Sequence, residues 1–192
     1  MRFLIQLLSM VAVALVVGFG LSYYALTDGR LLGALKVGPW AAWPAVGSAS
    51  PDPYTRAYLA RTGALQLGQG EGLAFTAADD SDGHPLDRSC RYRIEGTTPV
   101  ATFWTLQAVA ADGSNIARPD GQLELRSSDI ARANDGSLVL TVSKTLAPAN
   151  WLEITGTGSF RLLLTFYDPS NLSGSGVAVQ SLPAIHREAC GA

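Results

Sequence analysis

Few side chains in this sequence stand in a pattern that supports catalysis. The 192 residues hold no glycine-rich phosphate loop, no Gly-x-Ser-x-Gly motif, no His-Glu-x-x-His motif and no pair of Cys-x-x-Cys motifs. The two histidines are His84, in a turn-rich stretch, and His186, beside Arg187 and Glu188. Because neither has a recognisable nucleophile or acid–base partner nearby, both are interpreted as surface residues. The sequence therefore identifies no catalytic residue and no cofactor.

An acidic run is the one stretch that suggests a metal. Asp79-Asp80-Ser81-Asp82-Gly83 has carboxylates at alternating positions, as a calcium loop does, but such a loop also needs a glutamate at position twelve. With Asp80 and Asp82 at the third and fifth positions, the first would be Ala78, which offers no side-chain ligand. Asp, Ser and Gly are also turn formers in their own right. The run is therefore predicted to be a solvated β-turn without a metal.

Five residues are the candidate contacts for a ligand or a partner: Trp40, Trp43, Asp52, Tyr54 and Arg56. Arg56 could present its fork of N–H donors to a carboxylate or phosphate. The alternative, favoured by the local pattern, is that Asp52 caps a helix while Arg56 pairs with a carboxylate of the same domain. The two tryptophans lie between Pro39 and Pro44 and could form an exposed platform. Their large apolar area favours burial instead.

One short helix would position Asp52 and Arg56. Asp52-Pro53 predicts an N-cap followed by proline at the first helical position. Residues at helical spacing then follow: Tyr54, Ala57, Tyr58 and Arg61. Gly63 is expected to end this helix.

Cys90 and Cys190 are the only cysteines, which suits one disulfide and an oxidising compartment. Closing a loop of 100 positions stabilises a protein by about 4–5 kcal/mol in the chain-entropy model. The bond would also hold the C-terminal segment, which otherwise would be prone to fray.

The N-terminal stretch Phe3–Leu26 contains no charged residue. A membrane-spanning helix needs about 20 apolar residues, whereas the apolar core of a cleaved signal peptide has about 7–15 and is followed by small residues. A cut after Ala25 would place Tyr23 where a small side chain is needed. We therefore predict a retained transmembrane anchor, or uncleaved signal, at residues 1–26. A juxtamembrane linker at 27–51 and one domain at 52–192 follow.

The location follows from the anchor and the cysteines. Basic residues on either side of the anchor are too few to decide its orientation, so the predicted disulfide places most of the chain on the exported side. In a bacterium this means an inner-membrane protein with its bulk in the periplasm. With 14 basic and 16 acidic residues, the chain has no electrostatic footprint for nucleic acid.

Beyond the short helix the hydrophobic period changes from 3.6 to 2, which predicts strands. Alternation and turn signals place them around Leu65, at Leu73–Ala77, Cys90–Glu95, Phe103–Ala108, Leu123–Leu125, Leu138–Val142, Phe160–Tyr167 and Val177–Ser181. Trp104 shares a face with Leu106, so Trp104, like Trp151, is assigned to packing rather than to a ligand groove. The predicted fold is mainly β, an antiparallel β-sandwich or jelly roll preceded by one transmembrane helix and one short helix.

Several motifs, in this order, resemble the bacterial family labelled domain of unknown function 1214. They are Gly38-Pro39-Trp40 with Trp43-Pro44, Asp52 to Ala57, Phe103-Trp104-Thr105-Leu106, Asn150-Trp151-Leu152, Arg161 to Tyr167 and Leu182-Pro183-Ala184-Ile185. The cysteine pair and the apolar N-terminus are similar to those of short, membrane-anchored members. The resemblance implies a jelly-roll-like sandwich and supplies no catalytic residue. It also implies a companion, because larger relatives carry the domain after a module labelled domain of unknown function 1254.

Two functions follow as hypotheses. The first is a membrane-tethered periplasmic module without enzyme activity that binds a companion protein of the 1254 type or an envelope ligand. The second is an enzyme acting on envelope glycans or small molecules through Asp52, Asp168 or Glu188. It would need two of these carboxylates facing each other in a cleft, about 5–9 Å apart. The missing catalytic signature favours the first hypothesis.

Overall fold

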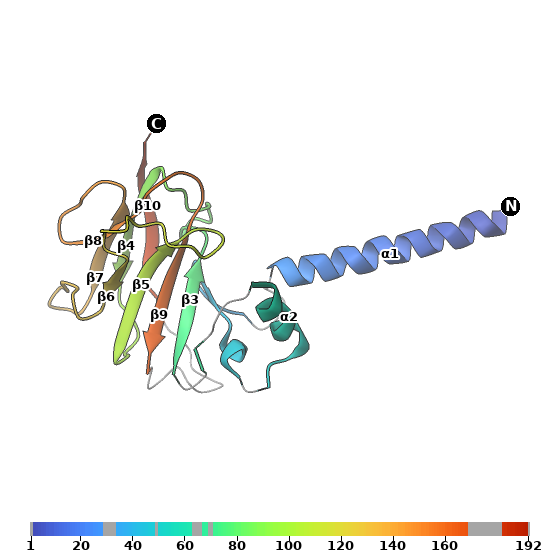
Figure 1. The fold of residues 1–192 in the computed structure, drawn as a ribbon, viewed down its shortest axis with the longest axis horizontal. Coiled ribbons are helices and arrows are strands. Elements are labelled where there is room, and N and C mark those ends of the chain that lie inside the picture. Colours follow the sequence, from blue (N-terminus) through green and yellow to red (C-terminus); the bar gives the residue numbers. More distant parts are fainter. Residues whose placement is uncertain are drawn as a thin grey trace.

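The structure is a computed structural model that describes residues 2–28, 34–48, 50–62, 67–68, 71–168 and 182–191. Two helices, one 3₁₀ helix (η1) and ten strands follow one another along these residues (Figure 1). In order they are α1 (Arg2–Asp28), β1 (Leu35–Val37), β2 (Trp40–Ala42), η1 (Pro44–Gly47), α2 (Pro53–Thr62), β3 (Gly72–Ala77), β4 (Cys90–Gly96), β5 (Phe103–Val109), β6 (Glu124–Arg126), β7 (Leu138–Ser143), β8 (Asn150–Glu153), β9 (Arg161–Tyr167) and β10 (Ala184–Cys190).

The first sheet has six antiparallel strands in the order β1-β2-β3-β9-β5-β6. Its centre is β9, whose alternating Leu162, Leu164 and Phe166 point into the core while their neighbours face outward. At one edge, β1 and β2 extend the sheet with residues that the sequence analysis had given to the linker. Trp40 and Ala42 of β2 are fully buried, so this segment packs as part of the domain.

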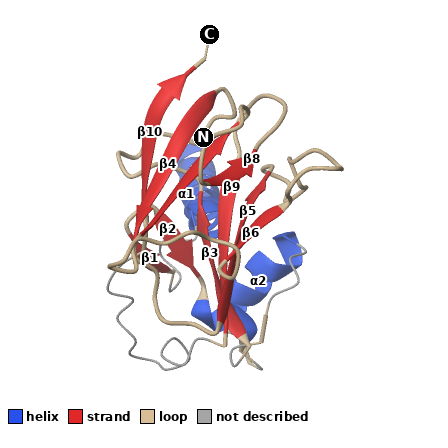
Figure 2. Cartoon of the chain, turned by 90° about the vertical axis from the view of Figure 1, so that its left-hand side faces the viewer, coloured by secondary structure: helices blue, strands red, loops and turns tan. Residues whose placement is uncertain are grey.

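The second sheet has four strands in the order β10-β4-β7-β8 (Figure 2). Its pairs are antiparallel except for β7 and β8, which run parallel. In β4, Cys90, Tyr92 and Ile94 are buried while Arg91, Arg93 and Glu95 lie on the outer face. This is the alternation that the sequence predicts for a half-buried strand.

Both sheets contribute to one apolar core, which gives a sandwich-like arrangement. Phe75, Trp104 and Phe166 of the first sheet belong to the same buried cluster as Tyr92 and Leu140 of the second. Phe75 and Phe166 meet edge to face, with ring centroids 5.9 Å apart. The prediction of a mainly β protein with one long apolar helix and one short helix is confirmed. The strands predicted around Leu65 and at Val177–Ser181 lie outside the described residues.

Helix α1 is long and apolar enough to cross a membrane. Its stretch Arg2–Tyr24 has 23 residues with a mean hydropathy of 2.4, and no part of that stretch is buried by the rest of the described chain. A helix of this length extends about 34 Å at 1.5 Å per residue, compared with about 30 Å for the hydrocarbon core. Such a helix meets the requirements for a membrane span, and a signal sequence would also meet them.

Candidate functional site

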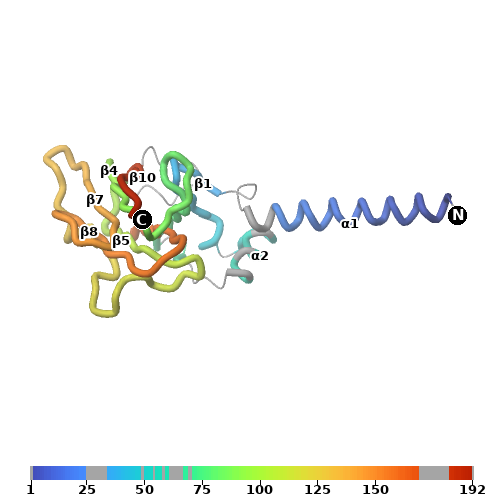
Figure 3. Tube along the Cα trace, turned by 90° about the horizontal axis from the view of Figure 1, so that it is seen from above, coloured from blue at the N-terminus to red at the C-terminus, as the bar shows by residue number. Residues whose placement is uncertain are grey.

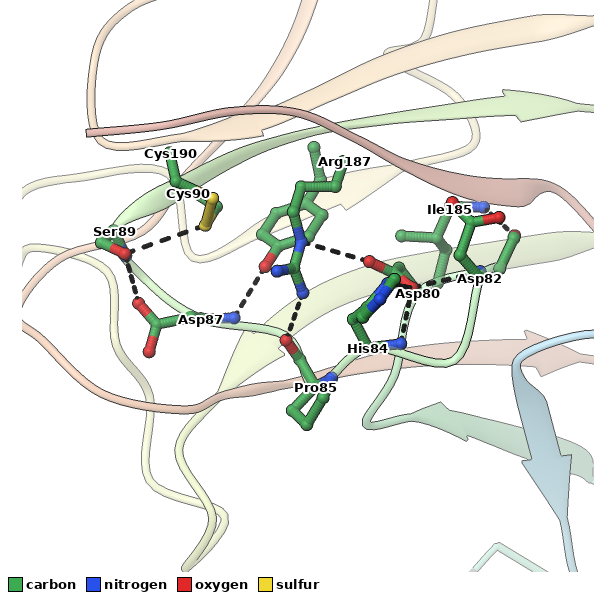
Figure 4. Close-up of polar contacts among 12 residues, drawn as sticks. Asp80, Asp82, His84, Pro85, Asp87, Ser89, Cys90, Ile185, Arg187 and Cys190 are labelled. Atoms are coloured by element: carbon green, nitrogen blue, oxygen red, sulfur yellow. Dashed lines mark hydrogen bonds and ion pairs between the residues drawn. A yellow bond between two sulfur atoms is a disulfide. The ribbon is translucent and has the colours of Figure 1, made fainter. Parts of the chain in front are cut away.

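A network of polar contacts lies where β10 returns along β4 (Figure 4). Cys190 and Cys90 are register partners on these two strands, and they form the disulfide predicted from the cysteine count. The bond fastens an edge strand, because β10 pairs with β4 on one side only. Along that strand, the Cys90–Cys190 bond stabilises one end and a loop, residues 79–87, covers the other.

Asp80 joins that loop to β10. Its side chain has no exposed surface, and its Oδ2 lies 3.2 Å from Nε of Arg187 as an ion pair. Its Oδ1 accepts the backbone N–H groups of Asp82, at 3.1 Å, and His84, at 2.8 Å. Burial raises the pKa of Asp80, but the His84 N–H, the Arg187 charge and the Asp82 N–H outweigh it and leave the pKa below its ordinary 3.8.

Ser81 continues the attachment of the loop to β10. Its backbone N–H donates to the carbonyl oxygen of Ile185 at 2.9 Å, and its Oγ accepts the backbone N–H of Ile185 at 2.8 Å. These bonds use the outward-facing backbone groups of Ile185, which an edge strand would otherwise present to another chain.

Tyr92 lies beneath the guanidinium of Arg187. The Cζ atom of Arg187 is 5.7 Å from the Tyr92 ring centroid, and its Nη2 donates to the carbonyl of Pro85 at 2.6 Å. The hydroxyl of Tyr92 accepts the backbone N–H of Asp87 at 2.7 Å. Burial raises the pKa of Tyr92, so the hydroxyl is neutral at ordinary pH. Arg187 and Tyr92 therefore hold the loop from two sides.

Asp80, Asp82 and His84 place ligand atoms within 4.8 Å of one another. Ser81 and Asp82 form the predicted turn, but Asp80 is buried and not solvated as that prediction had it. The contacts of Asp80 favour this turn over a metal site. Both oxygens of Asp80 already face donors, two N–H groups on one and a guanidinium on the other. A cation there would lie close to the positive charge of Arg187. The one buried carboxylate of the cluster, that of Asp80, therefore binds groups of the protein and holds the loop to β10.

This network makes a pH-dependent prediction. Because the folded-state pKa of Asp80 is lowered, its ionised form contributes stability above the ordinary pKa of about 3.8, and that contribution is lost as the pH falls through the folded value. At pH 7, Asp80→Asn is expected to lower the free energy of unfolding by about 1–3 kcal/mol, since an amide N–H₂ would face Arg187. Urea titrations of both proteins between pH 7 and pH 2.5 should show this difference shrinking below about pH 4. A difference that stays constant with pH would contradict the assignment.

A second feature is the outer face of the four-stranded sheet, which we call the β10–β8 face. It is defined by one row of register partners across all four strands: His186, Arg93, Thr141 and Trp151. Trp151 is partly exposed and donates from Nε1 to Oγ and to the carbonyl oxygen of Ser143, at 3.1 and 3.2 Å.

The neighbouring row of the β10–β8 face contains Glu95 and Val139, whose side chain is 41% exposed. Nε of Arg93 pairs with Glu95 Oε2 at 2.7 Å, and Nε2 of His186 lies 3.8 Å from its Oε1. This face thus displays an indole, an aliphatic side chain and charges of both signs.

The structure places the five candidate contacts on β2, just before η1 and at the start of α2. Trp40 is fully buried, and its Nε1 donates to the carbonyl of Pro183 at 2.7 Å, so it packs in the core as its apolar area favoured. Trp43 is partly buried just before η1. Asp52 accepts the N–H and the hydroxyl of Thr55, which is the predicted helix cap. Arg56 is exposed, and its Nε donates to the carbonyl of Pro51. The side chain of Tyr54 lies outside the described part of the chain.

The acids of the enzyme hypothesis lie on three different segments of the chain. Asp168 follows β9 and its Oδ2 accepts the Thr102 hydroxyl at 3.2 Å. Glu188 is exposed near the end of β10. The end of β9 and the end of β10 lie at opposite ends of the sandwich (Figure 1), while Asp52 is occupied as a helix cap. Asp168 and Glu188 therefore form no facing pair, and the carboxylate of Asp52 already accepts two hydrogen bonds from Thr55.

Sequence reasoning missed Arg187 and Tyr92 as members of one network, and it gave Trp151 to packing. Their signals were weak. An arginine with Glu188 as its neighbour has no preferred partner in sequence, and its carboxylate, Asp80, is more than 100 positions away. The register of β10 against β4 brings them together.

The fold and this geometry define a class, a disulfide-fastened two-sheet domain following an apolar helix. A family model described as "Protein of unknown function (DUF1214)" matches residues 71–171, more than half of the chain. The protein therefore belongs to the DUF1214 family, as its motifs predicted.

The solved structures similar to this chain include the two described here, and no curated protein matches it. The VPA0106 protein from Vibrio parahaemolyticus is 20% identical with a TM-score of 0.56; the match covers 73% of this chain and 36% of that one. An uncharacterised protein from Burkholderia cenocepacia is 18% identical with a TM-score of 0.43, covering 75% of this chain and 45% of that one. The chain thus spans about a third of the VPA0106 chain, and that likeness supports the fold alone.

Proposed function

We propose that this protein is a membrane-anchored, exported module that binds a companion protein and catalyses no reaction itself. The apolar helix α1 supports the anchor. The Cys90–Cys190 bond supports an oxidising compartment, since cytosolic thiols are kept reduced. A bacterial inner-membrane protein with its domain in the periplasm fits both observations. The dispersed carboxylates Asp52, Asp168 and Glu188 favour binding over hydrolysis.

The observation that carries the proposal is the composition of the β10–β8 face. Protein interfaces are enriched in tryptophan and arginine, and their strongest contacts come from such residues near the centre. Trp151 and Arg93 lie in one cross-strand row with Thr141 between them. The charges of Arg93, Glu95 and His186 lie at the rim of the proposed contact, where complementary charges would fix the orientation of the partner.

The companion proposed is a protein of the type labelled domain of unknown function 1254. The family resemblance implies it, because larger relatives carry both modules in one chain. The stretch of the VPA0106 chain that is similar to this one makes up 36% of that chain, so that larger protein holds further sequence beside the shared fold. We propose that the two modules dock through the β10–β8 face as separate chains, whereas the larger relatives carry both modules in one chain.

Site-specific photo-crosslinking tests this function. A benzophenone amino acid at Thr141, in the full-length protein co-expressed with a 1254-type protein from the same bacterium, should yield a crosslinked heterodimer. The matched control is Arg161, which is exposed on the outer face of the other sheet. Trp151→Ala should weaken co-purification at least about tenfold, with the urea midpoint measured to verify folding. Equal crosslinking from Thr141 and Arg161, or none from either, would refute the proposed face.

A further inference from the structure

The end of the domain nearest α1 is built from β1 and α2, two elements that follow α1 closely in the sequence. Helices α1 and α2 are in contact, and α2 also packs on η1. Strand β1 begins seven residues after α1 ends. Both views place β1 and α2 on the side of the sandwich that faces α1, with β7 and β8 on the far side (Figures 1 and 3).

Two described cations lie on these segments. Lys36 is the exposed residue of β1, and Arg56 is exposed on α2. The Nε of Arg56 donates to the carbonyl of Pro51 at 3.0 Å, which holds the guanidinium near the start of α2. Helix α2 contains no acidic residue, and the carboxylate of Asp52 before it is directed to Thr55.

We propose that this end of the domain rests on the membrane surface, where Lys36 and Arg56 bind the phosphates of anionic phospholipids. The inference rests on the proposed function, because it requires α1 to remain in the membrane as an anchor. Helix α1 has 27 residues and extends about 40 Å, so its ends lie in the headgroup regions of a bilayer about 40–45 Å thick. Anything in contact with the end of α1 is then held at headgroup depth. Arginine matches a phosphate with two parallel hydrogen bonds, and lysine binds it as a point charge.

Lipid contact at this end would also orient the domain. In Figure 1 the strands of the sandwich run across the axis of α1, and β7 and β8 of the second sheet lie on the side away from the helix, opposite the sheet edge formed by β1. Lys36 and Arg56 would fix this orientation. The proposed partner surface would then remain accessible above the membrane.

The experiment is a lipid-selectivity measurement on the full-length protein in proteoliposomes. Spin-labelled phosphatidylglycerol and phosphatidylcholine are compared for wild type, Lys36→Gln, Arg56→Gln and the control Lys144→Gln, which is exposed on the β7–β8 connection. Each of the first two variants should reduce the preference for phosphatidylglycerol by up to about fivefold, as expected for one cation at an anionic surface. Lys144→Gln should leave the preference unchanged.

The outcomes separate this inference from the function on which it rests. Intact mass and carbonate extraction first establish whether α1 is retained and inserted. A cleaved protein would overturn both the anchor and the lipid contact. An inserted protein with no preference for phosphatidylglycerol, or with equal losses in all three variants, would overturn the lipid contact and leave the anchored binding module standing.

Discussion

Replacing Cys90 and Cys190 with serine is expected to lower the free energy of unfolding by about 2–5 kcal/mol. The bond closes a loop with a sequence separation of 100, and long loops give the largest loss of unfolded-state entropy on closure. The native state should survive, because β10 keeps its ladder with β4, its bonds to Ser81 and the contacts of Arg187.

Urea unfolding in detergent micelles under non-reducing conditions measures this effect. The matched comparison is the wild type treated with a reductant, because the reductant breaks the Cys90–Cys190 bond without changing a residue. Reduced wild type and the double serine variant should agree within about 0.5 kcal/mol. An oxidised wild type no more stable than its reduced form would show that the disulfide contributes nothing to stability.

Most of the strands that the sequence predicted correctly alternate over six or seven residues; the exception is the three-residue strand β6, predicted at Leu123–Leu125. In β9 the alternation of Leu162, Leu164 and Phe166 with outward-facing neighbours determines both the strand and the buried face. Strands β1 and β2 have three residues each, too few for a period to be recognised. Strand β8 follows Ala149, which has a φ of 64°, and is buried at three of its four positions, so it shows no alternation.

Strand β10 was not predicted for a different reason. Its sequence after Ile185 is mostly polar and exposed, which is typical of an edge strand that must not pair with another chain. A register shift between Arg187 and Ala189 breaks the period further. The charged side chains that keep an edge strand from pairing with another chain also remove the hydrophobic alternation by which a strand is predicted.

The disulfide is the part of the candidate site that could be predicted from the sequence, because the chain has two cysteines. Two cysteines allow one intramolecular bond, so Cys90 and Cys190 could be paired without a structure. Trp40 illustrates the opposite case. Its pairing with the carbonyl of Pro183 spans 143 positions, and nothing local distinguishes it from an exposed tryptophan. The same holds for Asp80 and Arg187, whose contact depends on the register of β10 against β4.

Tyr92→Ala is expected to lower the free energy of unfolding by about 3–5 kcal/mol, the usual cost of removing a buried aromatic ring. The Tyr92 side chain is fully buried, and its ring lies 5.7 Å from that of Phe160. Its loss would leave a cavity and would uncover the guanidinium of Arg187, which lies over the ring.

Tyr92→Phe separates the hydroxyl from the ring. The backbone N–H of Asp87 would lose its 2.7 Å acceptor, and an orphaned, partly buried N–H costs about 1–3 kcal/mol. Tyr167→Phe is the matched control: Tyr167 is half-buried on the outer face of β9 beside Phe103, and a change there should stay within about 0.5 kcal/mol. Urea unfolding of the three variants at pH 7 gives the ranking. Equal, small effects of Tyr92→Phe and Tyr167→Phe would show that the loop at Asp87 is held without the hydroxyl. In that case Asp80, Ser81 and the bond from Arg187 to the carbonyl of Pro85 would hold the loop to β10.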